Sequence, residues 1–428
     1  MLKKIRITIP SLYKILSLLT CFQFLSIIAK TQDSYLTLVG EVADIRTKTP
    51  LGYANITILG RSIGTTSNMN GGFEFHIPTQ YSNDTLAISF IGYNTYKICL
   101  ADLKSQALVS VRMQPSIYQL EEITIHDKPY TVYSLLEDVM KKYDSNYNTK
   151  PYEMEAFYRE TRRENEKYGY LLEAAFHIYQ KTYKLPYQSL LEEIRINRYD
   201  EAFDYKTNEN FLKSLLMNDY IGEPNSGFYR HFKKTHKYII EDTTFIDYEP
   251  VYVVSLGNVV DWKETWYINA KDFAIIKFVG EGNYGADGNL VMGKVSKDKV
   301  LRYRYLKVVN SYSLIGEKYY LKYMSMRLDH DVYDQQKKSS ETYKIIEREV
   351  MVNRVNSVNM KPLVSSETMK SYSLEDQLKK YNAAFWDNYN VMVRTRLQEQ
   401  IAKDLESRET LDEQFKKQQE TVKKKKKN

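Results

Sequence analysis

Apolar and polar positions alternate with a period of two from Leu36 to Ile125, in short runs separated by turn residues. Ile56 and Ile58, for example, share one face of such a run. We expect Gly60–Thr66 to form a corner and Asn68–Gly72 a tight hairpin, because Asn and Gly tolerate positive φ. About seven short strands, with turns every eight to twelve residues, predict a two-sheet β-sandwich.

The pattern changes after a polar break at His126–Pro129. From Leu135 to Tyr143 apolar residues recur at three- and four-residue steps, which predicts an amphipathic helix. Beyond Pro151 the alternation returns and predicts a second, larger antiparallel sheet. Its expected elements are strands at Met154–Tyr158, Tyr168–Tyr179, Val251–Leu256, Val300–Val309, Tyr319–Leu328 and Tyr343–Val355, a hairpin at Trp266–Ile276, and a short helix at Phe211–Met217.

The C-terminal part has a helical period. Apolar residues from Leu374 to Tyr389 predict a helix that packs back on the sheet, and Leu397–Leu405 continues at four-residue steps. After Glu406 charges dominate, with only Leu411 and Phe415 apolar, so a solvated helix is expected. The run Lys423–Lys427 is either solvated or touches anionic lipid or lipopolysaccharide.

The N-terminus has the layout of a secretory signal peptide. Four basic residues precede an uncharged apolar run from Ile15 to Ala29, and cleavage just before Gln32 would follow small residues. An uncleaved anchor helix is the alternative, whereas a lipidated Cys21 fits poorly because the apolar run continues past it. We therefore expect an exported protein of the periplasm or outer membrane, with no membrane span once the signal is removed.

Composition narrows the range of partners. Cys99 is the one cysteine beyond the predicted signal, which excludes an internal disulfide in the mature chain. The net charge of +7 includes ten cations in the leader and the terminal lysine run, and without them it falls to −3. No stripe of basic residues interleaved with aromatics is present, so nucleic acid is not an expected partner.

Several phrases of the first region carry a family resemblance, namely Gly40-x-Val42-x-Asp44, Pro50-Leu51-x-x-Ala54-x-Ile56, Gly64-Thr65-Thr66 with Gly71-x-Phe73, Phe90-Ile91-Gly92-Tyr93 and Leu120-Glu121-Glu122-Ile123. In this order they resemble the carboxypeptidase-regulatory-like domain, which implies a transthyretin-like (prealbumin-type) sandwich at the head of an exported protein. The chain has Asn68 and Asn70 where the family usually has Asp, so a role that depends on those carboxylates is not expected.

The second region has a weaker resemblance. Trp266-Tyr267-Ile268-Asn269 followed by Ala274-Ile275 is similar to a step in the curved half-barrel of lipoprotein-localisation carriers, over about Tyr252 to Val355. The phrases Ala156-Phe157-Tyr158-Arg159-Glu160 and Phe385-Trp386-Asp387-Asn388-Tyr389 also resemble a group of uncharacterised envelope proteins. The carrier resemblance implies a concave apolar face that could hold an acyl chain.

The sequence lacks the catalytic motifs of several common enzyme classes. Zinc carboxypeptidases need His and Glu three residues apart plus a distant His, yet none of the six histidines has Glu at that spacing. Neither a Gly-x-Ser-x-Gly elbow nor a phosphate-binding loop occurs, and the adjacent acids Glu192 and Glu193 are expected on a solvated strand. The 38 tyrosines suit half-buried strands, or alternatively a sugar- or lipid-binding surface.

These patterns together predict a mainly β protein: a prealbumin-like sandwich, then a large antiparallel sheet that could form a half-barrel, with a few helices and a C-terminal helix. The expected division is a signal peptide at 1–31, the sandwich at 34–126, a linker helix at 127–150, the sheet domain at 151–395 and a charged tail at 396–428. No catalytic, cofactor-binding or metal-binding residue and no cofactor is predicted.

The favoured function is a non-enzymatic envelope binding or assembly protein, with outer-membrane components, lipid or glycan as candidate partners. A hydrolase and a lipid or lipoprotein carrier are the alternatives. A receptor barrel of about 22 strands would not fit in the remaining length.

Overall fold

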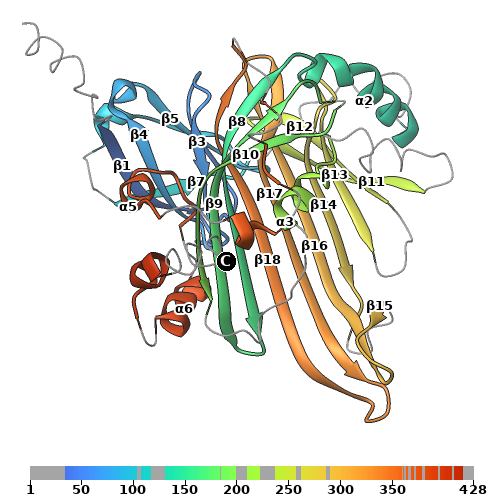
Figure 1. Ribbon diagram of the computed structural model, residues 1–428. Coiled ribbons are helices and arrows are strands. Elements are labelled where there is room, and N and C mark those ends of the chain that lie inside the picture. The colour runs from blue at the N-terminus through green and yellow to red at the C-terminus, as the bar shows by residue number, and fades with distance from the viewer. Residues whose placement is uncertain are drawn as a thin grey trace, which may run out of the picture.

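The computed structural model describes residues 34–103, 108–116, 131–183, 185–198, 210–221, 237–256, 262–285, 290–358, 360, 363–364, 368–370, 373–377, 381–393, 396–406 and 409–417. The predicted signal peptide, the expected strand at Leu120–Ile125, the polar break at His126–Pro129 and the lysine run lie outside these residues. The described chain is mainly β, with a small N-terminal sandwich beside a large sheet of long strands (Figure 1).

The sandwich has two sheets, ordered β4-β1-β7 and β3-β2-β5-β6. Strand β1 pairs antiparallel with β4 and parallel with β7. Alternate residues of the strands face inward, so that Leu38, Ile56, Phe75 and Ile88 are fully buried in one core. The strands are β1 (Tyr35–Asp44), β2 (Asn55–Ile58), β3 (Gly64–Thr66), β4 (Gly72–Pro78), β5 (Thr85–Ser89), β6 (Tyr96–Cys99) and β7 (Leu108–Met113).

Two local predictions for the sandwich were wrong. The segment expected as a corner contains strand β3, and Asn68–Gly72 does not close a hairpin, because β3 and β4 belong to different sheets. The turn instead carries the chain from one sheet to the other. The Asn68 side chain accepts hydrogen bonds from the backbone N–H groups of Asn70 and Gly72, and Gly71 has a φ of +77°. The residues suit a tight turn, but they do not specify which strands it joins.

The large sheet has eleven strands, ordered β10-β9-β8-β18-β17-β16-β14-β13-β12-β11, with β15 paired to β16. All of its pairings are antiparallel, as predicted. The expected hairpin is β13 and β14, and the three expected long strands are β16, β17 and β18. Bounds are β8 (Tyr152–Glu164), β9 (Lys167–Gln180), β10 (Gln188–Arg198), β11 (Tyr238–Ile246), β12 (Glu249–Leu256), β13 (Lys263–Asn269), β14 (Ile275–Asn283), β15 (Leu290–Lys294), β16 (Lys299–Ile315), β17 (Lys318–Asp334) and β18 (Ser339–Asn356).

Both faces of the large sheet are covered in part. On one face the predicted helices α2 (Val132–Asn146) and α3 (Phe211–Leu216) complete the largest apolar core. The opposite face packs against the sandwich and the C-terminal segment through Phe157, Tyr323 and Met351. Among the described residues, no helix is both long and apolar enough to cross a membrane.

The C-terminal helices differ from the sequence prediction. Instead of one helix from Leu374 to Tyr389, a 3-10 turn (Leu374–Gln377) precedes a four-residue helix α5 (Ala383–Trp386), whose N-terminus is capped by the Asn382 side chain. Helix α6 (Arg396–Leu405) then packs on β9.

The helix after Glu406 was expected to be solvated, and that expectation was wrong. Leu411 and Phe415 are buried together with Leu171 of β9 and Ile401 of α6. Two apolar residues four positions apart lie on one side of a helix, and they suffice to dock it when an uncovered sheet face is near.

Candidate ligand-binding cleft

The sandwich docks onto the large sheet along two lines of backbone contact. The first lies at the end of β18, where Ile63 forms an antiparallel bridge with Arg354. Beside it, the backbone N–H of Val355 donates to the Ser62 carbonyl at 2.9 Å. This contact fixes the β2–β3 turn of the sandwich against the sheet.

The second line lies at the turn between β11 and β12. Asp247 and Tyr248 both have positive φ, as a type I′ turn requires. The Asp247 carboxylate accepts hydrogen bonds from the backbone N–H and the hydroxyl of Thr95, both at 2.6 Å. The backbone N–H of Gly92 donates to the Phe245 carbonyl at 2.7 Å. The turn thus binds the sandwich sheet next to its edge strand β6, on the opposite edge from β3.

A cleft of about 430 Å³ lies between the sandwich and the sheet, with Thr95 and Asp247 of the second docking line at its wall. Strands β2, β5 and β6 form one wall, and β14, β16 and β17 form the other. Its volume is in the range of small-molecule binding sites.

Lys322 projects into this cleft because of a β-bulge. In the pairing of β16 with β17, Ser311 lies opposite Tyr323 and Tyr312 lies opposite Leu321, so Lys322 is the extra residue. A bulge re-aims side chains, and here it brings Lys322 to the sandwich side. The absence of a side chain at Gly64 makes room, since a Cβ there would lie 3.1 Å from the Lys322 Nζ.

The buried Lys322 ammonium has a backbone carbonyl as its hydrogen-bond acceptor and no described carboxylate at ion-pair distance. The side chain is buried, and its Nζ donates to the Val352 carbonyl at 2.8 Å. Burial disfavours the charged form and lowers the pKa of Lys322 to about 7.

A second lysine reaches the same cleft from β14. Lys277 lies opposite Ser311, which in turn lies opposite Tyr323, so these side chains form one row across the sheet. Lys277 and Lys322 are thus two strands apart, which corresponds to roughly 10 Å between their backbones. Burial, followed by the positive charge of Lys307, lowers the pKa of Lys277 to about 8.

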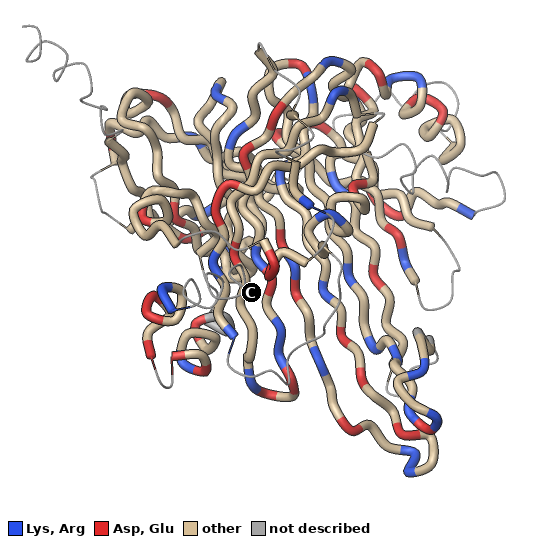
Figure 2. The backbone as a smooth tube through the Cα atoms, viewed as in Figure 1, with Lys and Arg blue, Asp and Glu red and all other residues tan. Residues whose placement is uncertain are grey.

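The two lysines contrast with the other charges of the sheet. Along the long strands, charges of both signs are interspersed (Figure 2) and many are paired, such as Arg302 with Asp331 at 2.8 Å. Within the described part of the chain, no carboxylate lies at ion-pair distance from Lys277 or Lys322. Asp247, the one described acid at the cleft wall, is engaged by Thr95. An exposed third lysine, Lys97, adds to the positive charge.

The rest of the wall combines apolar side chains with the polar side chains of several Asn, Ser and Thr residues. Ile91, Ile246 and Ile276 line the cleft together with the rings of Tyr53 and Tyr323. Leu59 and Leu314 line it as well, and they are 53% and 55% exposed. Exposed apolar side chains around a cavity are typical of a site that is covered when a ligand binds.

This arrangement can bind an anionic group next to an apolar chain. An acceptor that carries negative charge would supply the counter-charge that the fold does not give to the lysines. The apolar wall would remove hydrocarbon from water.

Neither lysine was singled out from the sequence. The sequence did contain an indication of them, because each lysine interrupts an otherwise apolar strand segment. These segments are Ile275-Ile276-Lys277-Phe278 and Tyr320-Leu321-Lys322-Tyr323. Three tyrosines lie beside Lys322 in β17. Tyr319 and Tyr323 line the cleft, and Tyr319 and Tyr320 both belong to the largest apolar core.

The histidines and paired acids have local roles. His177 lies between Glu153 at 2.7 Å and Glu192 at 3.2 Å, and the hydrogen bond to Glu192 is the first cause of its raised pKa. Glu192 is 41% exposed, as expected for an acid on a solvated face, and it also contacts His177. In the described ranges no group of three or more His, Cys, Asp or Glu is placed to hold a metal ion.

Comparison with known families confirms the first resemblance. Residues 38–125 match the family of CarboxypepD_reg-like domains. This segment covers the sandwich, so the N-terminal part of the chain is a domain of that type. A comparison with curated proteins found no match.

Among solved structures, matches include proteins of the lipoprotein-carrier kind. One is an outer membrane lipoprotein-sorting protein domain from Vibrio parahaemolyticus, at 10% identity over 54% of this chain and 94% of that chain, with a TM-score of 0.24. A LolA superfamily protein from Nitrosomonas europaea has 13% identity over 56% and 98%, with a TM-score of 0.22. A DUF1329 family protein from Desulfovibrio piger has 10% identity over 54% and 95%, also at 0.22. These TM-scores are too low for the matches to support a conclusion about the fold of the large sheet.

Proposed function

We propose that this protein is a non-enzymatic binding protein of the bacterial envelope, and that its cleft holds an amphiphile with an anionic head group. Lys277 and Lys322 would contact the head group, and the apolar wall would cover the chain. The predicted signal peptide supports an exported location, in the periplasm or at the outer membrane.

The observation that carries this proposal is the presence, in one partly apolar cleft, of two desolvated lysines to which no described carboxylate is ion-paired. Burying an ammonium without a counter-charge is costly, so a fold that does so twice in one cavity gains from an anionic ligand. A neutral ligand would supply no counter-charge, so the free-energy cost of burying the two ammonium groups would remain.

Native mass spectrometry of the protein purified from its own envelope tests the proposal. We expect a co-purifying lipid-sized mass on the wild type, its loss in the double variant K277M/K322M, and its retention in K263M. Lys263 is a matched control because it is exposed and paired with Glu241 at 3.0 Å.

Titration with defined probes completes the test. Dodecyl phosphate should bind the wild type at least about tenfold more tightly than the double variant, since a hydrogen bond to a charged group contributes about 1.5–3 kcal/mol. Dodecyl maltoside, which is neutral, should bind both proteins alike. A clean apo mass together with no preference for the phosphate would contradict the proposal, and turnover of a bound ester would make the protein a hydrolase.

A further inference from the structure

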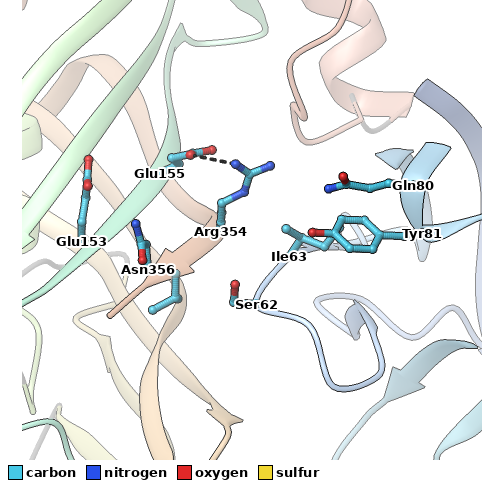
Figure 3. A pocket seen from close by; sticks show the side chains of 9 residues that line it. Ser62, Ile63, Gln80, Tyr81, Glu153, Glu155, Arg354 and Asn356 are labelled. Carbon is cyan, nitrogen blue, oxygen red and sulfur yellow. Dashed lines mark hydrogen bonds and ion pairs between the residues drawn. The ribbon is translucent and has the colours of Figure 1, made fainter. Parts of the chain in front are cut away.

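A second pocket lies at the first docking line, where β18 meets the β2–β3 turn of the sandwich. It has a volume of about 300 Å³. The large sheet contributes Glu153, Glu155 and Arg354, and the sandwich contributes Gln80 and Tyr81 from the 3-10 turn Thr79–Tyr81 (Figure 3). Two parts of the chain that are far apart in sequence therefore face each other across this pocket.

Much of its hydrogen-bonding capacity is unused within the protein. Among the described residues, the side chains of Ser62, Gln80 and Tyr81 make no hydrogen bond to one another or to their surroundings. Arg354 contacts Glu155 through one nitrogen at 3.4 Å and is 44% exposed, so most of its N–H groups are available. The pocket thus offers hydroxyl and amide groups that both donate and accept, a guanidinium that donates and carboxylates that accept.

The charges of the pocket offset one another. Arg354 pairs with Glu155, and Glu153 lies 2.7 Å from the Nδ1 of His177. A strongly anionic ligand would meet the two glutamates, whereas a cation would meet Arg354. The pocket therefore favours a neutral polar ligand, unlike the lysine-lined cleft.

Apolar surface is also present between the polar groups. Ile63 and Val355 line the pocket, and the Tyr81 ring lies opposite Arg354 with its hydroxyl directed toward the large sheet (Figure 3). Tyrosine combines an apolar ring with a polar end, which suits ligands that have C–H faces and hydroxyl edges. Sugars have this chemistry.

We infer that this pocket binds a neutral glycan segment, with Gln80, Tyr81 and Arg354 donating to or accepting from its hydroxyl groups. The site is independent of the amphiphile cleft, because the two have no lining residue in common. Since both parts of the chain contribute, a bound glycan would also hold the sandwich against the sheet.

Saturation-transfer NMR on the full-length mature protein tests this inference with three neutral probes: maltotriose, cellotriose and N,N′-diacetylchitobiose. At least one should show transfer, with a millimolar dissociation constant as expected for a small open site. The double substitution Q80A/R354M should weaken binding of that probe at least about tenfold. Y81F keeps the ring but removes the hydroxyl, and it should weaken binding of the probe by a few-fold. If R354M fails to fold, Q80A alone keeps the test intact, because Gln80 is exposed.

Two controls separate this site from the cleft. R112M removes a half-buried arginine of the same sandwich that pairs with Glu41 at 2.7 Å, and it should leave glycan binding unchanged. K277M/K322M should also leave it unchanged, whatever its effect on dodecyl phosphate. The inference is overturned if none of the three probes shows transfer, or if Q80A/R354M binds the probe as tightly as the wild type does.

Discussion

The ring of Tyr53 stacks on the ring of Tyr323, with centroids 4.8 Å apart and planes inclined by 27°. Tyr53 precedes β2 in the sandwich, and Tyr323 lies in β17 of the large sheet. Both rings line the cleft, and the Tyr323 hydroxyl donates to Glu349 at 2.9 Å. The stack is thus an aromatic contact between the two parts of the molecule, next to Lys322.

A double-mutant cycle on this stack should measure its contribution. We expect Y53A and Y323A each to lower the free energy of unfolding, with a coupling of about 1 kcal/mol between them, as for other aromatic pairs. Urea unfolding of the wild type, both single variants and the double variant gives this number. A coupling near zero would mean that the rings touch without stabilising the docking.

The depressed pKa of Lys322 predicts a pH dependence of stability. Between its folded value of about 7 and its ordinary unfolded value the unfolded chain binds more protons, so stability rises with pH across that window. Below about pH 7 the full cost of the buried charge is present, about 5 kcal/mol at most.

The variant K322M removes this titration and is expected to be more stable than the wild type near pH 7. The advantage should shrink as the pH rises toward 10. The urea midpoints of both ligand-free proteins are measured in parallel over this pH range. Tyrosine titration affects both proteins equally, so it drops out of the difference between the two midpoints. A constant difference across this range would show that Lys322 is not desolvated.

Glu173 lies fully buried between two arginines. It pairs with Arg159 at 2.8 Å and with Arg195 at 2.6 Å. Arg159 also donates to the Met392 carbonyl at 2.5 Å, and the Arg195 guanidinium lies 4.2 Å from the centre of the Trp386 ring. The carboxylate therefore positions two of the contacts that hold the C-terminal segment on the sheet.

The substitution E173Q should cost about 3–5 kcal/mol, because it leaves buried arginines without their counter-charge. Limited proteolysis should then cut the segment 381–393 faster than in the wild type. E192Q is the matched control, since Glu192 is on the neighbouring strand and 41% exposed, and it should change stability by about 0–1 kcal/mol. Equal effects of the two variants would contradict this role of Glu173.

The Asn68 side chain connects the turn after β3 to the C-terminal segment. Its Oδ1 accepts from two backbone N–H groups of the turn, as a carboxylate could, but its Nδ2 donates to the Val393 carbonyl at 3.1 Å. We expect N68D to lose that donor and to destabilise the protein by about 1–3 kcal/mol. Thermal unfolding at neutral pH checks this, with the exposed N70D as control; an unchanged midpoint for N68D would refute it.

Local patterns in the sequence determined most of the elements. Alternation identified β8, β9 and the long strands β16 to β18, and apolar residues at three- and four-residue steps identified α2, because side-chain direction follows from backbone geometry within one element. The turn residues and the order of short phrases identified the N-terminal domain. Short edge strands such as β3 and β6 were missed, since three or four residues carry too little pattern.

Tertiary structure decided the candidate sites. The sequence shows a lysine in a strand, but only the register shift opposite Ser311 and Tyr312 turns Lys322 toward the sandwich. Likewise, Gln80 and Arg354 meet across a pocket only because Ile63 bridges to β18. Strand register and docking depend on contacts between residues that are distant in sequence, and a local pattern carries no information about them.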